Sequence, residues 1–349
     1  MTLNCDILHR LTLALTLGAL GGFTFQMLGL PLAWMLGPMS FNLVAALGGA
    51  PVAIPSGLRT GIQVLLGVLL GSTFSPEMAQ RAVDWPWSLL AVVIYTLVST
   101  LLVTFYYRRV AGLDALTAVY SATPGGMNAM ILMGSAAGGD ERRIALAQSL
   151  RITLVVALVP PLVLSLSSGY PTAAVPVQPV ETFEPWQMAW LTIGAGVGLL
   201  LARQLRLPAP ELTGPMLVSA TLYLTGWVEY HPPEVLLSVT LWILGSAVGV
   251  RFKGVGVVEL LRLGRYALGA VVLALLVAAA FAALIAQLPG VDYLPALLAL
   301  SPGGIAEMCL IAVAWHIDPA FVAFHHLARM LLVIVLAPWL GRLLALMER

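Results

Sequence analysis

The sequence has 349 residues, of which 60% are hydrophobic and 9% are charged, and its formal net charge is +1. Because soluble domains carry about 25% charged residues, this composition excludes a soluble globular protein. The small net charge argues against a nucleic-acid-binding surface, so no nucleic-acid partner is expected. The two cysteines, Cys5 and Cys309, lie in dissimilar segments and indicate no disulfide framework.

Long apolar segments follow one another along the chain. Stretches such as 88–105 and 267–286 reach the roughly 20 residues that an α-helix needs to cross a bilayer. In lipid, a helix satisfies its own backbone hydrogen bonds. We therefore predict an all-α polytopic membrane protein with six apolar segments in each half. In the first half these segments are 11–28, 32–49, 57–74, 85–107, 114–138 and 142–166.

The second half of the chain repeats the first at an offset that stays constant except for a slip of a single position. The stretch LGLPLAWMLGPM at 28–39 corresponds to LRLPAPELTGPM at 205–216. The Pro-Gly-Gly stretch at 124–126 recurs at 302–304. Matches that keep their spacing over this length indicate an internal duplication.

The duplication defines the predicted domains. We predict a first membrane repeat at 1–166, a Pro-rich extracytoplasmic linker at 167–185 and a second membrane repeat at 186–349. The apolar run at 11–28 resembles a secretory signal peptide. Its counterpart at 188–205 indicates instead a helix that the protein retains.

The distribution of basic residues indicates how the repeats are oriented. Suppose that the fifth apolar segment of each half, which carries Pro-Gly-Gly, enters the membrane and returns to the same side. Fourteen of the 17 basic residues then share one side, Arg81 lies on the other, and Arg151 and Arg329 lie within the membrane. Because basic loops favour the cytoplasm, this pattern predicts two inverted-topology repeats with both termini cytoplasmic. The expected fold has about ten spanning helices and two re-entrant or broken Pro-Gly-Gly segments.

Each Pro-Gly-Gly stretch is expected to end one half-helix and to begin another. Irregular backbone at membrane depth is stable only when it is buried in protein or lines a cavity. The first N–H groups and the positive dipole end of the following half-helix suit an anion. The alternative is a kinked helix whose glycines permit close packing. The candidate substrate-binding residues at these breaks are Pro124, Gly125, Gly126, Pro302, Gly303 and Gly304.

Arg151 and Arg329 occupy equivalent places, each eleven residues after an aspartate that precedes the last apolar segment of its half. At 1.5 Å per residue this spacing is about 16 Å, which is close to the middle of a bilayer core about 30 Å thick. A charge at that depth indicates a functional site, and two arginines with two helix N-termini can hold a carboxylate. Alternatively, the arginines bind the carbonyl groups of the broken helices.

Polar side chains follow both breaks, at Asn128 and Glu307, although Glu307 aligns strictly with Ala129. A buried glutamate beside arginines can balance charge, or take up a proton as a site opens and closes. It can equally form a structural pair with an arginine. We therefore count Asn128 and Glu307, with Arg151 and Arg329, among the candidate substrate-binding residues.

Four aspartates precede apolar runs, which is typical of helix N-caps. They are Asp114, Asp140, Asp292 and Asp318. The repetition of Asp114 and Asp292 also makes them candidates for coupling-ion binding. His325 lies one to two turns from Arg329 and is a third coupling candidate, because histidine titrates near neutral pH. The histidines and methionines form no convincing ligand set, so we expect neither a metal site nor a cofactor.

The duplicated LGPM or TGPM, followed by TPGG or SPGG and by a later mid-membrane arginine, resembles the AbrB family of bacterial integral membrane proteins. The resemblance covers essentially the whole chain, and it implies a multi-pass protein of the bacterial inner membrane. Members carry two labels, regulator of gene expression and ammonia monooxygenase. The family is distinct from the small soluble DNA-binding proteins that share its name. Its general plan is similar to that of inverted-repeat carriers.

The leading hypothesis is a secondary transporter for a small anionic organic solute, bound at the membrane midplane between the broken helices and the two arginines. Its partners would be the lipid bilayer and the anion, and a homo-oligomer is left open. The alternative is a solute-sensing membrane regulator that affects gene expression through a partner. A monooxygenase-type enzyme is less favoured because that chemistry needs a metal or a cofactor. We therefore expect no enzymatic activity.

Overall fold

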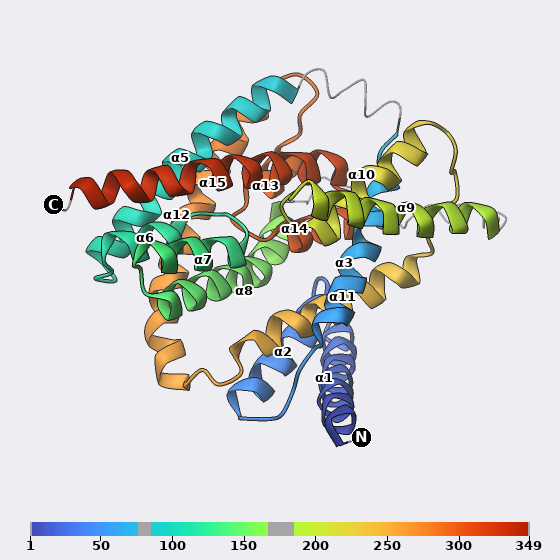
Figure 1. Ribbon diagram of the computed structural model, residues 1–349, viewed down its shortest axis with the longest axis horizontal. Coiled ribbons are helices and arrows are strands. Elements are labelled where there is room, and N and C mark those ends of the chain that lie inside the picture. Colours follow the sequence, from blue (N-terminus) through green and yellow to red (C-terminus); the bar gives the residue numbers. More distant parts are fainter. Residues whose placement is uncertain (1, 76–84, 167–184, 348–349) are drawn as a thin grey trace. The chain divides into compact units, whose positions relative to one another are not determined.

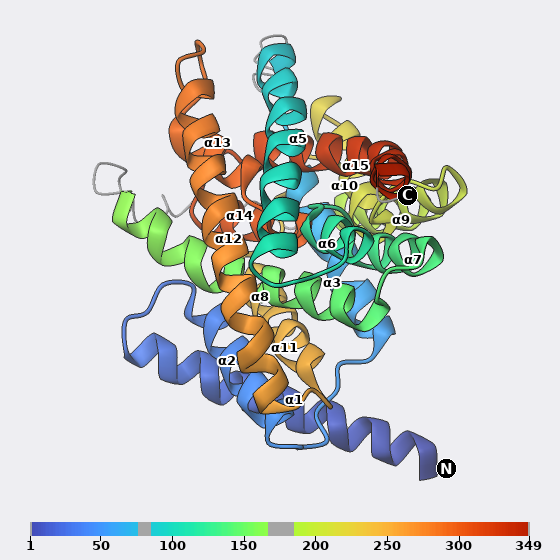
Figure 2. The ribbon, with the colours of Figure 1, turned by 90° about the vertical axis from the view of Figure 1, so that its left-hand side faces the viewer.

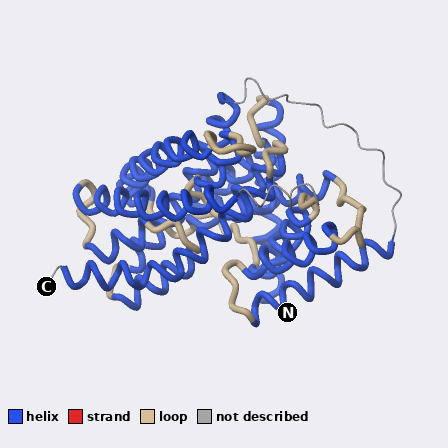
Figure 3. The backbone as a smooth tube through the Cα atoms, turned by 90° about the horizontal axis from the view of Figure 1, so that it is seen from above, coloured by secondary structure: helices blue, strands red, loops and turns tan. Residues whose placement is uncertain are grey.

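The structure of this protein is a computed structural model that describes residues 2–75, 85–166 and 185–347. Regular structure in these ranges comprises fourteen α-helices and one short 3-10 helix, without strands (Figure 1, Figure 3). The predicted all-α class is therefore confirmed. Except for Pro185, the predicted linker at 167–185 lies outside the described residues. The first-half helices are α1 (Thr2–Met27), α2 (Ala33–Leu47), α3 (Ser56–Gly71), α5 (Trp85–Arg109), α6 (Ala115–Ala122), α7 (Met127–Ala137) and α8 (Glu141–Leu166).

The second half repeats the helix order of the first. Its helices are α9 (Pro185–Gln204), α10 (Pro210–Leu224), α11 (Glu234–Gly249), the 3-10 helix η2 (Val250–Phe252), α12 (Val257–Ile285), α13 (Tyr293–Leu300), α14 (Ile305–Ala314) and α15 (Pro319–Met347). Several equivalent helices have equal lengths: α2 and α10 have 15 residues, α3 and α11 have 16, and α6 and α13 have 8. This agreement supports the duplication, and the inverted orientation of the repeats stays a prediction.

Seven helices in the described ranges are long and apolar enough to cross a membrane, so the chain is a multi-pass membrane protein. The candidate spans are Asp6–Met27, Trp85–Arg109, Glu141–Leu166, Pro185–Gln204, Glu234–Phe252, Val257–Ile285 and Pro319–Leu336. The helices α2 and α3 have only 15 and 16 residues. At 1.5 Å per residue they extend about 22–24 Å, which is shorter than the hydrocarbon core. The number of about ten spanning helices therefore stays a prediction.

The chain divides into two compact units, and each unit draws on both halves of the sequence. Unit 1 is bounded by Met1–Gln80, Ala157–Val255 and Cys309–Ala320, and unit 2 by Arg81–Val156, Gly256–Met308 and Phe321–Arg349. Unit 1 thus holds α1–α3 with α9–α11, and unit 2 holds α5–α7 with α12 and α13, together with most of α8 and α15. This division differs from the predicted division into repeats, which follows the duplication in the sequence and stays a prediction.

Glycine pairs bring neighbouring helices of unit 1 into backbone contact. A Cβ atom added to Gly21 of α1 would collide with the backbone of Gly37 on α2. The equivalent collision in the second half joins Gly198 of α9 to Gly214 of α10. Small residues at such contacts are typical of membrane helix packing. The duplication is therefore preserved in the packing as well as in the sequence.

Helices of unit 1 also exchange contacts between the two halves of the sequence. Gly67 of α3 lies against the backbone of Leu212 on α10, and the equivalent Gly245 of α11 lies against the backbone of Met35 on α2. The contact of the first half with the second is therefore the same as the contact of the second half with the first. Such a reciprocal contact is typical of elements related by a two-fold axis.

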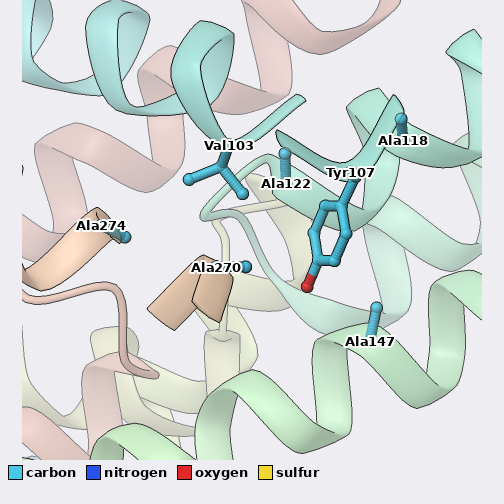
Figure 4. Close-up of a cluster of buried hydrophobic side chains, with 7 residues drawn as sticks. All are labelled: Val103, Tyr107, Ala118, Ala122, Ala147, Ala270 and Ala274. Carbon is cyan, nitrogen blue, oxygen red and sulfur yellow. The ribbon is translucent and has the colours of Figure 1, made fainter. Parts of the chain in front are cut away.

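In unit 2, the long helices α5 and α12 lie side by side (Figure 2). A Cβ atom at Gly269 of α12 would collide with the Tyr106 side chain on α5, so this contact also depends on a glycine. A cluster of small and aromatic side chains joins the two helices to α6 and α8, as Figure 4 shows. Its buried members are Val103, Tyr107, Ala118, Ala122, Ala147, Ala270 and Ala274. This cluster supports the first helix break.

Candidate functional site

The Pro-Gly-Gly stretches interrupt the helices where the sequence predicts. The helix α6 ends at Ala122 and α7 begins at Met127, while α13 ends at Leu300 and α14 begins at Ile305. Residues 123–126 form the first break and residues 301–304 form the second. Proline supplies no backbone N–H, and glycine weakens a helix, so neither stretch continues the preceding helix. Both breaks belong to unit 2.

The residues that precede the two prolines close the first half-helices in the same way. The hydroxyl of Thr123 donates to the carbonyl of Val119 at 2.7 Å, and the hydroxyl of Ser301 donates to that of Leu297 at 2.8 Å. Each side chain thereby satisfies one carbonyl group in the last turn. The carbonyl groups of the break residues themselves need donors from elsewhere, because the backbone there is not helical.

Arg329, on α15, supplies such donors to the second break. Its Nη1 atom donates to the carbonyl oxygens of Leu300 and Ser301 at 3.0 and 2.8 Å, and its Nη2 atom donates to that of Gly303 at 3.2 Å. The side chain is only 1% exposed. Arg329 therefore holds the second break together, which is the structural alternative that the sequence left open. Its predicted contact with a substrate stays a prediction.

His326 is the fourth partner of Arg329. The Nη2 atom of Arg329 lies 2.7 Å from Nδ1 of His326, whose Nε2 lies 3.0 Å from the carbonyl oxygen of Leu298. Because a guanidinium group only donates, Nδ1 accepts and Nε2 carries the proton. The imidazole is therefore neutral. His326 and Arg329 form one network that joins α15 to the end of α13 and to the second break.

Arg151, on α8, has a different environment from its counterpart. Its Nη1 atom donates to the carbonyl oxygen of Thr123 at 2.8 Å, which corresponds to the contact of Arg329 with Ser301. It has no equivalents of the further contacts that Arg329 makes with Leu300, Gly303 and His326, and no carboxylate oxygen among the described residues lies within 4.0 Å of the guanidinium group. The residue is only 6% exposed. A buried, unpaired charge costs several kcal/mol, so this cation calls for an anionic partner.

Gln148 occupies the place in the first half that His326 occupies in the second. Its amide nitrogen donates to the carbonyl oxygens of Tyr120 and Thr123 at 2.7 and 3.2 Å. Its Oε1 atom is buried and has no partner in the protein. The sequence pattern singled out neither Gln148 nor His326. One signal was present, since each lies three residues before its arginine and the two are therefore equivalent in the duplication.

A cavity in unit 2 brings the two breaks together, since Pro124, Pro302 and Arg151 all line it. Its volume is about 10 Å³, which is room for about one water molecule. Hydroxyl side chains contribute polar lining, at Ser99, Tyr107 and Ser121. Figure 4 shows part of the apolar wall, to which Val103, Ala122, Ala270 and Ala274 contribute. An apolar wall with a few polar groups is typical of sites for small organic molecules, but a solute larger than water would need the surrounding helices to move apart.

Glu307 lies at the third position of α14, directly after the second break. It is 5% exposed, and its carboxylate folds back over Gly304, where a Cβ atom would collide with Oε2. An acidic side chain at the start of a helix interacts favourably with the N–H groups there. Glu307 also attracts the Arg151 guanidinium group electrostatically, whereas Arg329 repels it. The half-helix α14 therefore has a carboxylate from its own chain segment, that of Glu307, at its N-terminus.

Other predicted residues lie away from the cavity or have structural contacts. Asn128 is exposed and does not line the cavity. Asp114 is the N-cap of α6, where Oδ1 accepts a hydrogen bond from the backbone N–H of Thr117 at 2.8 Å. Asp292 precedes α13 without a capping bond from its side chain. The capping interpretation is therefore confirmed for Asp114, and the coupling roles of both aspartates stay predictions.

His325 points away from Arg329, into an aromatic cluster. Its ring stacks on Phe321 with a centroid distance of 3.8 Å, and Trp85 lies 5.7 Å away. Nδ1 lies 2.8 Å from the carbonyl oxygen of Phe321, and Nε2 lies 2.8 Å from the hydroxyl of Ser88. Both ring nitrogens are thus engaged in unit 2. The histidine that contacts the buried arginine is His326, and a coupling role for His325 stays a prediction.

Comparisons with known proteins agree in covering nearly all of the chain. Residues 34–345 match a family model described as "Transition state regulatory protein AbrB". A protein of Escherichia coli (strain K12) named "Putative regulator AbrB" is 28% identical over 350 residues, which cover 98% of this chain and 97% of that protein. A protein of Bacillus subtilis (strain 168) named "Uncharacterized protein YhjN" is 26% identical over 359 residues, with coverages of 95% and 92%.

Proposed function

The chain belongs to the AbrB family, and on this premise we propose that it is a secondary transporter for a small anionic organic solute. We place it in the bacterial inner membrane with both termini in the cytoplasm. The multi-pass helical fold and the cavity between two broken helices support this proposal. Broken helices at a central site are a common feature of secondary transporters.

The observation that carries the proposal is the environment of Arg151. A guanidinium group that is 6% exposed lines the cavity, with one hydrogen bond and no carboxylate partner among the described residues. A structural arginine would be surrounded by acceptors, as Arg329 is at the second break. An anionic solute would give Arg151 the negative partner that the protein does not supply.

The other side chains of the site take supporting roles in the proposal. Ser99, Ser121 and Tyr107 offer hydroxyl groups to the polar part of the solute, and the alanines of α6 and α12 contact its apolar part. Arg329 and His326 hold the second break in shape, and Gln148 does the same at the first. All of these residues belong to unit 2, so the complete site would move with that unit during alternating access.

The experiment is a flux measurement on purified protein in proteoliposomes. Uptake of small radiolabelled carboxylates is compared for the wild type, Arg151→Met and Arg262→Gln. Arg262 is an exposed residue of α12 and serves as the matched control for the loss of one positive charge. We expect uptake by the wild type and the control, and none by Arg151→Met. Equal uptake by all three proteins, above empty liposomes, would overturn the role of Arg151.

A second candidate function is a membrane regulator that senses the same solute. It is favoured by the name of the Escherichia coli relative, "Putative regulator AbrB". A sensor would bind the anion at Arg151 but would not move it, so ligand-induced thermal stabilisation without flux would favour this function. Neither function involves chemical turnover. We therefore expect the solute to be recovered unchanged after incubation with the protein.

A further inference from the structure

We propose that the solute carries a single negative charge, and that its anionic group binds at the first break, where the protein has no counterpart of the Glu307 carboxylate. In this place it would correspond to the carboxylate of Glu307 beside Gly304 at the start of α14. The inference rests on the proposed anion site and adds the charge class of the solute and the break that receives it.

The two breaks are equivalent in their local contacts. In the duplication, Arg151 corresponds to Arg329 and Gln148 to His326. Each arginine donates to the carbonyl oxygen of the residue before the proline, at 2.8 Å in both halves. Gln148 and His326 approach the equivalent carbonyl oxygens of Tyr120 and Leu298 at 2.7 and 3.0 Å. The two halves therefore build the same local frame, and a difference within it is informative.

One carboxylate breaks this equivalence. Glu307 is the third residue of α14 and folds back over Gly304. The third residue of α7 is Ala129, which has no polar side chain. A Cβ atom at Gly126 would have a single neighbour within 4 Å, the methyl group of Met330 at 3.4 Å. The place that a carboxylate fills at the second break is therefore accessible to a ligand at the first.

The protein leaves a set of polar groups without partners on the side of the first break. Nε of Arg151, Oε1 of Gln148 and the hydroxyl of Ser121 are all buried and make no hydrogen bond in the protein. Arg151 and Ser121 also line the cavity. Buried polar groups are normally paired. These groups therefore point to a ligand independently of the helix N-terminus.

The balance of buried charge indicates how many charges the ligand carries. The buried charged residues in the described part of the chain are Arg151, Arg329 and Glu307. His326 is neutral, because it accepts from Arg329 and donates to Leu298. His325 lies in the aromatic cluster and not at the breaks, so the three charged residues give the site a net charge of one positive unit. A monoanion would neutralise this charge, whereas a dianion would leave one buried negative charge uncompensated, which is costly.

The decisive variant is Ala129→Glu, which gives the first break the glutamate that the second already has. We expect it to occupy the place of the ligand and to reduce the apparent affinity for monocarboxylates by about 100-fold, since a buried charge pair contributes several kcal/mol. Ala129→Gln is the matched control of equal size without charge, and it should retain measurable binding. The probes are propionate, lactate, succinate and malate, measured by thermal shift and by uptake into proteoliposomes.

A second variant keeps the inference testable if Ala129→Glu does not fold. Glu307→Gln raises the buried charge by one unit, so it should shift preference toward succinate and malate, by about tenfold relative to propionate and lactate. Unchanged selectivity in Glu307→Gln, or wild-type affinity in Ala129→Glu, would overturn the inference. Loss of uptake in Arg151→Met together with either of these results would leave the proposed function intact. Uptake that does not depend on Arg151 would contradict both the proposed function and this inference.

Discussion

Arg329→Met should lower the stability of the protein strongly, whereas Arg151→Met should leave its stability nearly unchanged and abolish binding of the anion. Methionine keeps a long, flexible side chain and removes the charge and the donors. Arg329 serves three backbone carbonyls and His326, so Arg329→Met leaves four buried acceptors without this donor. An unsatisfied buried polar group costs about 1–3 kcal/mol, and such costs do not add fully within one network. We expect a loss of about 3–5 kcal/mol in the free energy of unfolding.

Arg151→Met should cost much less. The change removes one hydrogen bond, to Thr123, and also removes a buried charge that has no carboxylate partner among the described residues. The amide of Gln148 still donates to the same carbonyl group. Because these effects oppose one another, we expect a change within about 1 kcal/mol in either direction. Stabilisation by added monocarboxylates should be lost.

The assay is thermal unfolding of the purified variants in one detergent, with and without the carboxylate panel. Arg262→Gln is the control for an exposed arginine of unit 2. Equal loss of stability in Arg151→Met and Arg329→Met would refute the distinction between the two arginines. A retained ligand-induced shift in Arg151→Met would refute its role in binding.

Three further predictions concern other contacts of the structure, and each is measured by thermal unfolding in detergent. Gly198→Ala should destabilise by about 1–3 kcal/mol because its Cβ would meet the backbone of Gly214, whereas Gly57→Ala, in open space on α3, should be neutral or slightly stabilising. Equal effects would contradict the close packing of α9 and α10. Asp114→Ala should cost about 1 kcal/mol through the lost N-cap, and Asp292→Ala should cost less, since its side chain makes no capping bond. The reverse order would contradict this assignment. His326→Gln should be tolerated within about 1 kcal/mol, because an amide can accept from Arg329 and donate to Leu298, whereas His326→Leu should cost about 2 kcal/mol or more. Similar stability of these two variants would argue against the network.

The sequence pattern was sufficient to predict the helix breaks and the buried arginines. Proline and glycine interrupt helices through local backbone properties, and the second copy indicates that the spacing is not accidental. The burial of Arg151 and Arg329 is confirmed, and their depth in the membrane, expected from the rise per residue, stays a prediction. Capping by Asp114 is also a local feature, so a sequence pattern can predict it.

The partners of the buried side chains could not be predicted in the same way. His325 and His326 lie four and three residues before Arg329 on the same helix, so spacing alone does not choose between them. The rotation of α15 against its neighbours directs His326 to Leu298 and His325 to Ser88. The contrast between Arg151 and Arg329 depends on which backbone carbonyls each guanidinium group reaches, and this is set by packing. The division into compact units depends on packing between segments that are far apart in the chain, so it does not follow the halves of the sequence.

Direct measurement of uptake by Arg151→Met proteoliposomes tests the central claim, that Arg151 binds an anion which the protein transports. The wild type and Arg262→Gln should take up a monocarboxylate of the panel, and Arg151→Met should match empty liposomes while it keeps a near wild-type unfolding temperature. Uptake by a folded Arg151→Met protein at the wild-type rate would contradict the account.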